Sequence, residues 1–316
     1  MKQYPNFDLI RLLLASSVLV LHWFAFRGAA INFWWLPWDA VPCFVAISGF
    51  LIAGSFERNP NVGRFIWKRA CRLIPALISS LIMVAFLFGR QTVLPTLIVY
   101  FTAGMVEPQG QQNGVLWSLM VEEVLYASLM VMVLTGMIKR RWPVYVMLTV
   151  AVISLDFSVD MVGNYKRCAI AFLVGVTFYL QKDLLSRVKP YVWVGLVVLS
   201  YLNREDAHFQ LPYFSLLPSF PFNLYLAFQA TALLGLGAYG PKMWSRKLPD
   251  LSYGMYLYHV PILATLMKDF KDNRLLVALF AITFLVSLIS AYAIERPFIR
   301  LKGLSIRKVE HISIPA

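Results

Sequence analysis

Charged residues are scarce in this sequence: Asp, Glu, Lys and Arg make up 14% of its 316 residues, whereas 59% are hydrophobic. This composition, with a mean hydropathy of +0.66, excludes an ordinary soluble domain. Apolar runs extend from one end of the chain to the other, and no stretch is polar enough to form a separate soluble domain. We therefore predict a single all-α domain over residues 1–316, built as a polytopic helical bundle in a membrane.

Metal-binding and nucleotide-binding signatures are also missing. The three cysteines are scattered and lack metal-ligand spacing, and no two of the four histidines are four residues apart, so we expect no metal. No Walker A, GxGxxG, HExxH or GxSxG sequence occurs, which argues against an ATP-driven machine. The net charge of +13 comes from basic residues in short loops between apolar segments, a pattern typical of membrane topology. Nucleic acid is therefore not an expected partner.

Apolar stretches long enough to be considered as membrane spans occur at 8–26, 40–56, 73–89, 116–138, 143–158, 166–181, 191–203, 222–240, 251–267 and 275–294. A further run, 92–106, is interrupted by Pro95 and Gly104. If it does not span, the positive-inside rule is satisfied, because more than twice as many of the 29 Lys and Arg residues lie on one side as on the other. We predict about ten transmembrane helices, both termini cytoplasmic, an interfacial or re-entrant 92–106, and a cytoplasmic tail at 295–316.

The first apolar stretch carries Asp8, Arg11 and His22. At about 100° per residue, Arg11 and His22 lie within roughly 20° of one helical face and about 16 Å apart along the axis. Ionisable groups inside a spanning helix are costly and usually face a cavity or pathway. One face would then present a positive charge near the cytoplasm and a titratable base in the outer half. The alternative is an interfacial Asp8–Arg11 ion pair, with His22 reaching the outer headgroups.

Two further clusters carry charge. Lys68, Arg69 and Arg72 open the third span on the cytoplasmic side, and the last two share a helical face that suits a polyphosphate. The alternative is that these residues only set the membrane topology and attract anionic lipid.

Glu122 and Glu123 open the fourth span at the depth of His22. Because the two residues are adjacent, their side chains point about 100° apart on a helix, so only one of them faces a given partner. The alternative is a helix cap.

Several short motifs occur together and in order. They are Phe7-Asp8-Leu-Ile-Arg11…His22, Ala46-Ile-Ser48-Gly49-Phe50-Leu51-Ile52, Phe65-Ile-Trp-Lys-Arg69-Ala-Cys-Arg72-Leu-Ile-Pro75, Leu116-Trp117-Ser118-Leu-Met-Val-Glu122-Glu123, Leu251-Ser252-Tyr253…Leu257-Tyr258-His259-Val-Pro261 and Glu295-Arg296-Pro297-Phe298. With this ordered set, the sequence resembles the membrane acyltransferase-3 family of the polysaccharide or sugar O-acetyltransferase type, without the SGNH hydrolase domain of longer relatives.

The resemblance implies roles for the singled-out residues. His22 would be the catalytic base, and Glu122 or Glu123 would fix its imidazole tautomer or position the acceptor. Arg69, Arg72 and Lys68 would hold acyl-CoA, acetyl-CoA being the favoured co-substrate, with Arg11 beside the path of the donor. We assign substrate contacts to a separate group: Asp8, Ser48, Trp117 and Ser118. By packing alone, Ser48-Gly49 would simply let helices approach closely, and His259 would be a structural histidine.

The expected reaction moves an acyl group from cytoplasmic acyl-CoA to a sugar hydroxyl on the outer side of a bacterial cytoplasmic (inner) membrane. The acceptor would be a cell-envelope glycan or a lipid-linked glycolipid precursor. Aromatic residues around 27–39 and 204–221 would stack on sugar rings or form an interfacial belt. Direct transfer and an acyl-His intermediate both remain open, as do the oligomeric state and a lipid, peptide or small-molecule acceptor.

Two alternatives come from other classes of protein. One is a secondary transporter in which Arg11, His22 and Glu122 relay ions or protons, although no similarity between the two halves of the chain supports it. The other is a non-catalytic membrane sensor of the same fold. Thiol release from acyl-CoA would distinguish the enzyme from both.

Overall fold

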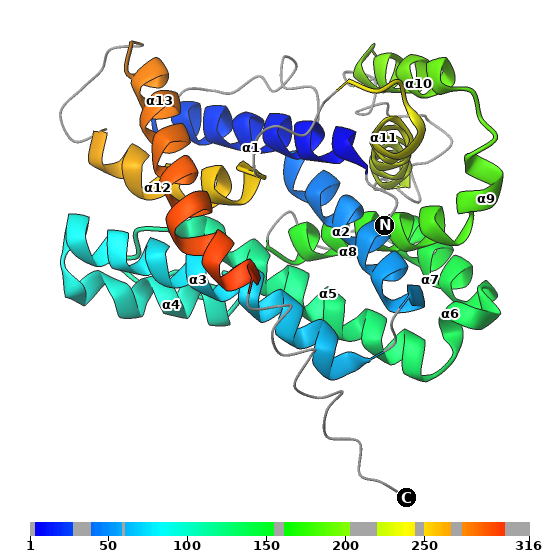
Figure 1. Cartoon of the computed structure of the whole chain (residues 1–316), viewed down its shortest axis with the longest axis horizontal. Helices are drawn as coiled ribbons and strands as arrows, with labels where there is room; N and C mark the ends of the chain where they lie inside the picture. Colours follow the sequence, from blue (N-terminus) through cyan, green and yellow to red (C-terminus); the bar gives the residue numbers. More distant parts are fainter. Residues whose placement is uncertain are drawn as a thin grey trace, which may run out of the picture.

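The computed structural model describes residues 4–27, 39–58, 61–154, 161–202, 220–243, 250–266 and 274–300. Within these ranges the chain forms helices and no strand, as expected for an all-α protein (Figure 1). The helices are α1 (Pro5–Phe26), α2 (Ala40–Arg58), α3 (Val62–Phe88), α4 (Val93–Phe101), α5 (Trp117–Leu134), α6 (Met137–Arg140), α7 (Trp142–Ile153), α8 (Met161–Leu180), α9 (Lys182–Leu185), α10 (Pro190–Leu202), α11 (Phe220–Tyr239), α12 (Ser252–Leu266) and α13 (Arg274–Ile289), which continues as a π-helix over Ser290–Glu295.

Within the described residues, each apolar stretch predicted to span overlaps a helix; these helices are α1, α2, α3, α5, α7, α8, α10, α11, α12 and α13. By length and composition, five helical segments of the described chain can cross a membrane: Asn6–Phe26, Ala40–Arg58, Val62–Phe88, Gly114–Leu134 and Arg274–Arg300. On α3, Ile78, Ile82 and Phe86 are exposed, as expected for a surface that faces lipid. The chain is an integral membrane protein, while the number of crossings and the side of each terminus stay predictions.

The ambiguous run 92–106 folds as a short helix. The chain turns after α3 at Gly89, whose φ of 91° suits glycine, and passes through the 3-10 turn Arg90–Thr92 into α4. With nine residues, α4 is about 14 Å long by its helical rise, roughly half the thickness of a hydrocarbon core. It ends at Phe101 and is followed by Ala103 and Gly104, both with positive φ.

Helices α2 and α8 form the most extensive helix–helix contact in the core. Two glycines permit it: a Cβ on Gly49 would collide with the carbonyl oxygen of Phe172, and a Cβ on Gly175 would collide with that of Ala46. Small residues let helices approach closely in a membrane, which is the packing role predicted for Ser48-Gly49. This rigid pair carries Ser48 on one wall of the pocket described below.

Helices α1 and α12 lie against each other and run in the same direction. Arg11, near the start of α1, reaches Asp250, just before α12, with 3.1 Å between Nη1 and Oδ2. Eleven residues later, His22 reaches His259 in the middle of α12, with 2.7 Å between Nδ1 and Nε2. The two contacts therefore occur in the same order along both helices, and they connect the two ends of the candidate site.

Candidate active site

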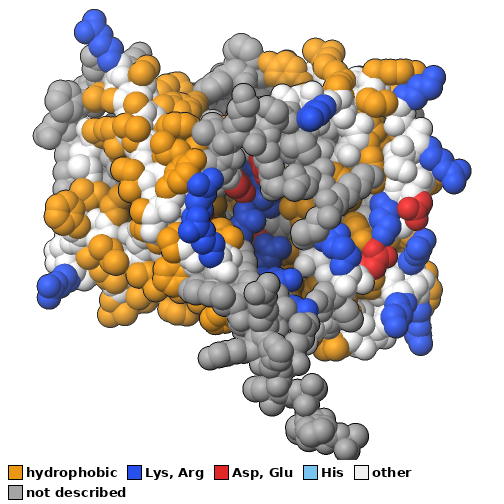
Figure 2. All heavy atoms as spheres, in the orientation of Figure 1, with side chains coloured by type: hydrophobic (Ala, Val, Ile, Leu, Met, Phe, Trp, Pro, Cys, Tyr) orange, Lys and Arg blue, Asp and Glu red, His pale blue; other side chains and the backbone are white. Residues whose placement is uncertain are grey.

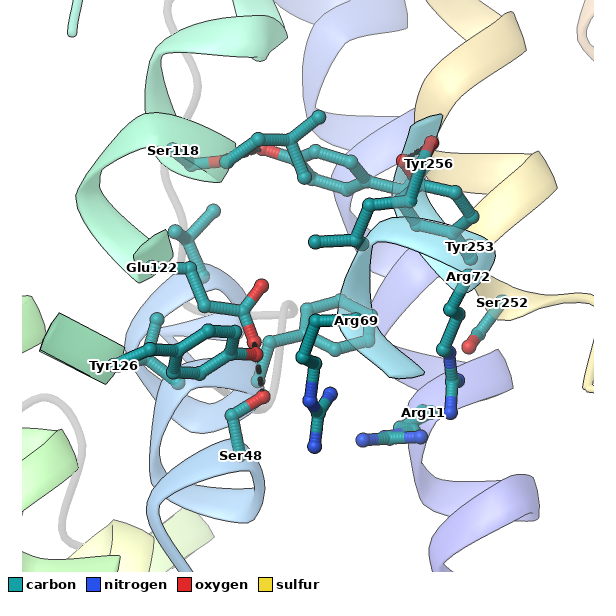
Figure 3. Close-up of a pocket in the computed structure, with 15 residues that line it drawn as sticks. Arg11, Ser48, Arg69, Arg72, Ser118, Glu122, Tyr126, Ser252, Tyr253 and Tyr256 are labelled. Atoms are coloured by element: carbon teal, nitrogen blue, oxygen red, sulfur yellow. Dashed lines mark hydrogen bonds between the residues drawn. The ribbon is translucent and has the colours of Figure 1, made fainter. Parts of the chain in front are cut away.

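A pocket lies where α1, α2, α3, α5 and the start of α12 meet (Figure 3). It encloses about 640 Å³, part of which is open to solvent. Its polar lining residues are Arg11, Ser48, Arg69, Arg72, Ser118, Glu122, Tyr126, Ser252, Tyr253 and Tyr256. The structure thus brings together residues that the sequence analysis drew from five separate motifs.

Three arginines occupy one end of the pocket, where their guanidinium groups point into a common space (Figure 3). Arg11 comes from α1, and Arg69 and Arg72 come from the shared face of α3 that their spacing predicts. In the space-filling view, Lys and Arg side chains gather in the middle of a face whose left part is largely hydrophobic (Figure 2). A concentrated positive charge of this kind suits an anion with several negative oxygens.

Asp250 neutralises part of this charge. Its Oδ2 accepts hydrogen bonds from Arg11 and, at 2.6 Å, from Arg72, while its Oδ1 accepts from the backbone and hydroxyl of Ser252. Burial by itself would raise the pKa of Asp250, but Arg72 and Arg11 more than offset this and lower the pKa from 3.8 to about 2. The sequence analysis missed Asp250, because an acid just before an apolar stretch looks like a helix boundary.

Arg69 is held differently. Its guanidinium lies over the rings of Phe65 and Tyr126, with centroid distances of 5.6 and 5.0 Å. Among the described residues, no ion pair or hydrogen bond engages its N–H groups. Stacking fixes the plane of the guanidinium while its donors stay available, which is the arrangement that a bidentate contact to phosphate requires.

The two adjacent glutamates diverge, as their spacing predicts. Glu122 faces the pocket, and its Oε1 accepts hydrogen bonds from the hydroxyls of Ser48 and Tyr126 (Figure 3). Glu123 turns towards α4 and accepts a hydrogen bond of 2.8 Å from Tyr100. In the part of the chain that the structure describes, neither glutamate is hydrogen-bonded to His22.

At the far end of the pocket from the arginines, Tyr256 meets Ser118, with 2.7 Å between the two hydroxyl oxygens (Figure 3). The ring of Tyr256 also lies near the imidazole of His259, with 6.0 Å between the ring centroids. Tyr256 thus lines the pocket and lies near the histidine pair, whose two members are not part of the lining.

The histidine pair joins α1 to α12. His22 is half-buried and its Nδ1 lies 2.7 Å from Nε2 of His259, which is fully buried. The other nitrogen of His259, Nδ1, lies 3.1 Å from the backbone carbonyl oxygen of Met255. Sequence analysis assigned His259 a structural role, since no sequence spacing links residues 237 positions apart. Its signals in the sequence are a histidine in an apolar run and its place in the motif Leu257-Tyr258-His259-Val-Pro261.

Pro261, two residues after His259, creates a contact that anchors the helix carrying this histidine. Pro261 lies inside α12 and has no N–H group, so the carbonyl oxygen of Leu257 lacks its usual helical donor. The side-chain amide of Asn113 donates to this oxygen at 3.0 Å and to the hydroxyl of Ser80 at 3.2 Å. Asn113 is fully buried. This contact attaches the middle of α12 to α3 and to the turn before α5.

The remaining predicted site residues are not in the pocket lining. Asp8, Lys68 and Trp117 are described but lie outside it, and Trp117 packs near Tyr165, with ring centroids 6.2 Å apart. The predicted aromatic segments 27–39 and 204–221 fall almost entirely outside the described residues. Among the residues that are described, no group of three His, Cys, Asp or Glu side chains is arranged to hold a metal ion.

The fold and site define a class: an integral membrane protein whose core holds an arginine-lined pocket near a histidine pair. Comparison with known sequences gives the family. The acyltransferase-3 family, described as an acyltransferase domain, matches residues 4–296, and the chain belongs to it. It is a membrane acyltransferase, and the family implies an acyl donor.

Two relatives align over most of the chain. One is Nodulation protein 10 of Rhizobium leguminosarum bv. viciae, 27% identical over 83% of this chain and 83% of the relative. The other is an O-acetyl transferase of Shigella phage Sf6, 25% identical over 86% of this chain and 90% of the relative. No solved structure matches the chain.

Proposed function

We propose that this protein transfers an acyl group, acetyl in the first instance, from cytoplasmic acyl-CoA to a sugar hydroxyl of a cell-envelope glycan or its lipid-linked precursor. The transfer would take place towards the outer side of a bacterial cytoplasmic membrane. One observation carries the proposal: α1 and α12 both border the arginine pocket, through Arg11 and Ser252, and further along the same two helices carry the histidine pair. The name of the phage relative, an O-acetyl transferase, supports an oxygen acceptor.

The arginines would bind the phosphates of the donor. Arg69 offers N–H groups that no described residue occupies, and Arg11 and Arg72 add positive charge that Asp250 only partly balances. From there the extended arm of the donor would follow α1, where Arg11 and His22 are separated by about 16 Å of helical rise. The thioester would pass Tyr256 and arrive beside His22.

His22 would act as the general base. Its Nε2 would take the proton from the acceptor hydroxyl as that oxygen attacks the thioester carbonyl carbon. The C–O bond forms, the C–S bond breaks, and the departing thiolate takes the proton back from Nε2, so that the ester and the free thiol of CoA are the products. Transfer through an acyl-His22 intermediate would start from the same nitrogen and the same lone pair.

Glu122 would support the donor site rather than the base. It accepts the hydroxyl hydrogen bond of Tyr126, and the ring of Tyr126 lies under the guanidinium of Arg69. Glu122 therefore fixes the ring on which Arg69 stacks, and Ser48 donates to the same carboxylate oxygen. In this arrangement Ser48 contributes through Glu122, and the substrate role predicted for it is indirect.

The test compares two arginines in purified protein reconstituted in lipid. Arg69→Ala should weaken CoA binding by about 10- to 100-fold, because a charge-assisted contact contributes about 1.5–3 kcal/mol. Arg140→Ala removes an exposed arginine on α6 and should leave binding unchanged. Equal CoA affinity in the Arg69→Ala variant and the wild type would show that the pocket is not the donor site.

A further inference from the structure

We propose that His259 is a positioning residue that holds His22 in one tautomer, with the proton on Nδ1 and the lone pair on Nε2. This inference rests on the proposed function, in which His22 is the base. It assigns to α12 a role in the chemistry that neither the sequence motifs nor the pocket lining assigns.

The tautomer follows from a chain of hydrogen bonds that starts at a backbone carbonyl. The oxygen of Met255 can only accept, so Nδ1 of His259, 3.1 Å away, must carry a proton. In a neutral imidazole the other nitrogen is then an acceptor, and here this is Nε2 of His259. Since Nε2 of His259 lies 2.7 Å from Nδ1 of His22, Nδ1 of His22 must be the donor. The lone pair of His22 is therefore on Nε2.

This arrangement leaves the reactive nitrogen available. Within the described part of the chain, no hydrogen bond reaches Nε2 of His22. His22 is half-buried, whereas His259 is fully buried, so the pair has one accessible end and one anchored end. A general base needs both features: an exposed lone pair and a second ring nitrogen with a fixed partner.

The anchor is rigid because it belongs to the backbone of α12. Met255 is four residues before His259 on the same helix, so its carbonyl oxygen cannot move away from the ring without unwinding a turn. Asn113 holds the next turn through the carbonyl oxygen of Leu257. In many enzymes a carboxylate orients the catalytic histidine. Here a neutral imidazole does so, which avoids placing a further charge deep in an apolar bundle.

Two variants at His259, with one control variant at Tyr258, distinguish a positioning role of His259 from a role in packing alone. His259→Leu removes the acceptor and should lower kcat by about 100-fold, the lower end of what a placed base contributes. The KM for acetyl-CoA should stay within about twofold, because the donor pocket is untouched. His259→Gln supplies an amide oxygen that can accept from His22, and it should restore kcat to within about tenfold of the wild type.

The matched control is Tyr258→Phe, which removes the buried hydrogen bond between Tyr258 and Ser290 but leaves the histidine pair. It should keep the kcat of the wild type even if it lowers stability. A His259→Leu protein with unchanged kcat, or a His259→Gln protein as slow as His259→Leu, would overturn the proposal.

A direct measurement keeps both residues of the histidine pair and so does not depend on how well the α12 variants fold. The sequence has four histidines, so His208→Gln with His311→Gln leaves only the pair. The ¹⁵N chemical shifts of labelled histidine in this protein should then report both imidazoles with protonated Nδ1 and unprotonated Nε2. A protonated Nε2 on neutral His22 would contradict the inference.

The failure of the inference can be distinguished from the failure of the proposed function. If His22→Ala keeps full transfer, His22 is not the base and the proposed mechanism is wrong. If His22→Ala is inactive while His259→Leu turns over like the wild type, the proposed function stands and only the role of His259 is lost.

Discussion

Each ionisable side chain of the site has a partner that offsets the cost of placing charge in an apolar bundle. Arg11 and Arg72 share the carboxylate of Asp250, Arg69 stacks on two rings, and Glu122 accepts two hydroxyl hydrogen bonds. Charges in such places are expensive and are retained where they carry function. Arg69 stands out because its partners are aromatic rings, which leave its N–H groups for a ligand.

Asp250 gives a test of this electrostatic balance. Its pKa is lowered from 3.8 to about 2, so its contribution to stability is complete above the unfolded-state value and is lost only as the pH falls through about 2. A shift of this size corresponds to on the order of 2 kcal/mol. Asp250→Asn should therefore lower the apparent melting temperature by about 5 °C, equally at pH 5 and pH 8.

The control is Asp183→Asn, which changes an exposed aspartate on α9 and should leave the melting temperature unchanged. A difference between wild type and Asp250→Asn that disappears between pH 8 and pH 5 would show that Asp250 titrates near neutrality, contrary to its pairing with Arg11 and Arg72.

At the scale of the element, glycine placement decides how closely helices approach. Gly175 of α8 leaves no room for a Cβ against the backbone of α2, whereas a Cβ on Gly195 of α10 would meet nothing within 4 Å. The two positions are both glycines inside apolar helices, and only one is a contact point. They form a matched pair for measuring what close packing contributes.

Gly175→Ala should destabilise the protein by about 1–3 kcal/mol, because the added methyl forces α2 and α8 apart. Gly195→Ala should be neutral or stabilise by about 0.5–1 kcal/mol, since alanine restricts the unfolded chain and fits a helix better. Thermal unfolding in detergent measures both. Equal effects of the two substitutions would contradict the close contact between α2 and α8.

The helices themselves could be predicted from the sequence, and their neighbours could not. Within the described residues, every apolar stretch proposed as a span overlaps a helix. The spacing of Arg11 and His22 placed both on one face of α1, and in the structure both side chains contact α12 or the residue before it. Periodicity gives such faces because it depends only on helical geometry. The partners Asp250 and His259 are more than 230 residues further along the chain. Only packing of the whole bundle brings them there.

At the scale of the molecule, the predicted threading assigns each loop to one side of the membrane. If 92–106 does not cross the membrane, Glu107 lies on the outer side and Ser186 lies on the cytoplasmic side. Both residues are exposed, and the three native cysteines are buried, so single new cysteines can be labelled with little background. A membrane-impermeant maleimide should label Glu107→Cys in intact cells and Ser186→Cys only after permeabilisation.

Labelling of Ser186→Cys in intact cells would show that the basic loops near α6 and α9 lie outside, and that 92–106 crosses the membrane after all. Arg11, Arg69 and Arg72 precede this run, so their predicted cytoplasmic side would not change, whereas the side of every later loop would be reversed. The sidedness of the chemistry depends on this threading, whereas the geometry of the pocket and of the histidine pair does not.

The central claim is that the arginine pocket and His22 are two parts of one acyl-transfer site. The most direct measurement is the release of CoA thiol from acetyl-CoA by purified protein in lipid, in the presence of a candidate glycan acceptor, for wild type and His22→Ala, with CoA binding measured on the same samples. The account predicts that only the wild type releases thiol in excess of background and that both proteins bind CoA with similar affinity. Thiol release by His22→Ala at the rate of the wild type would contradict it.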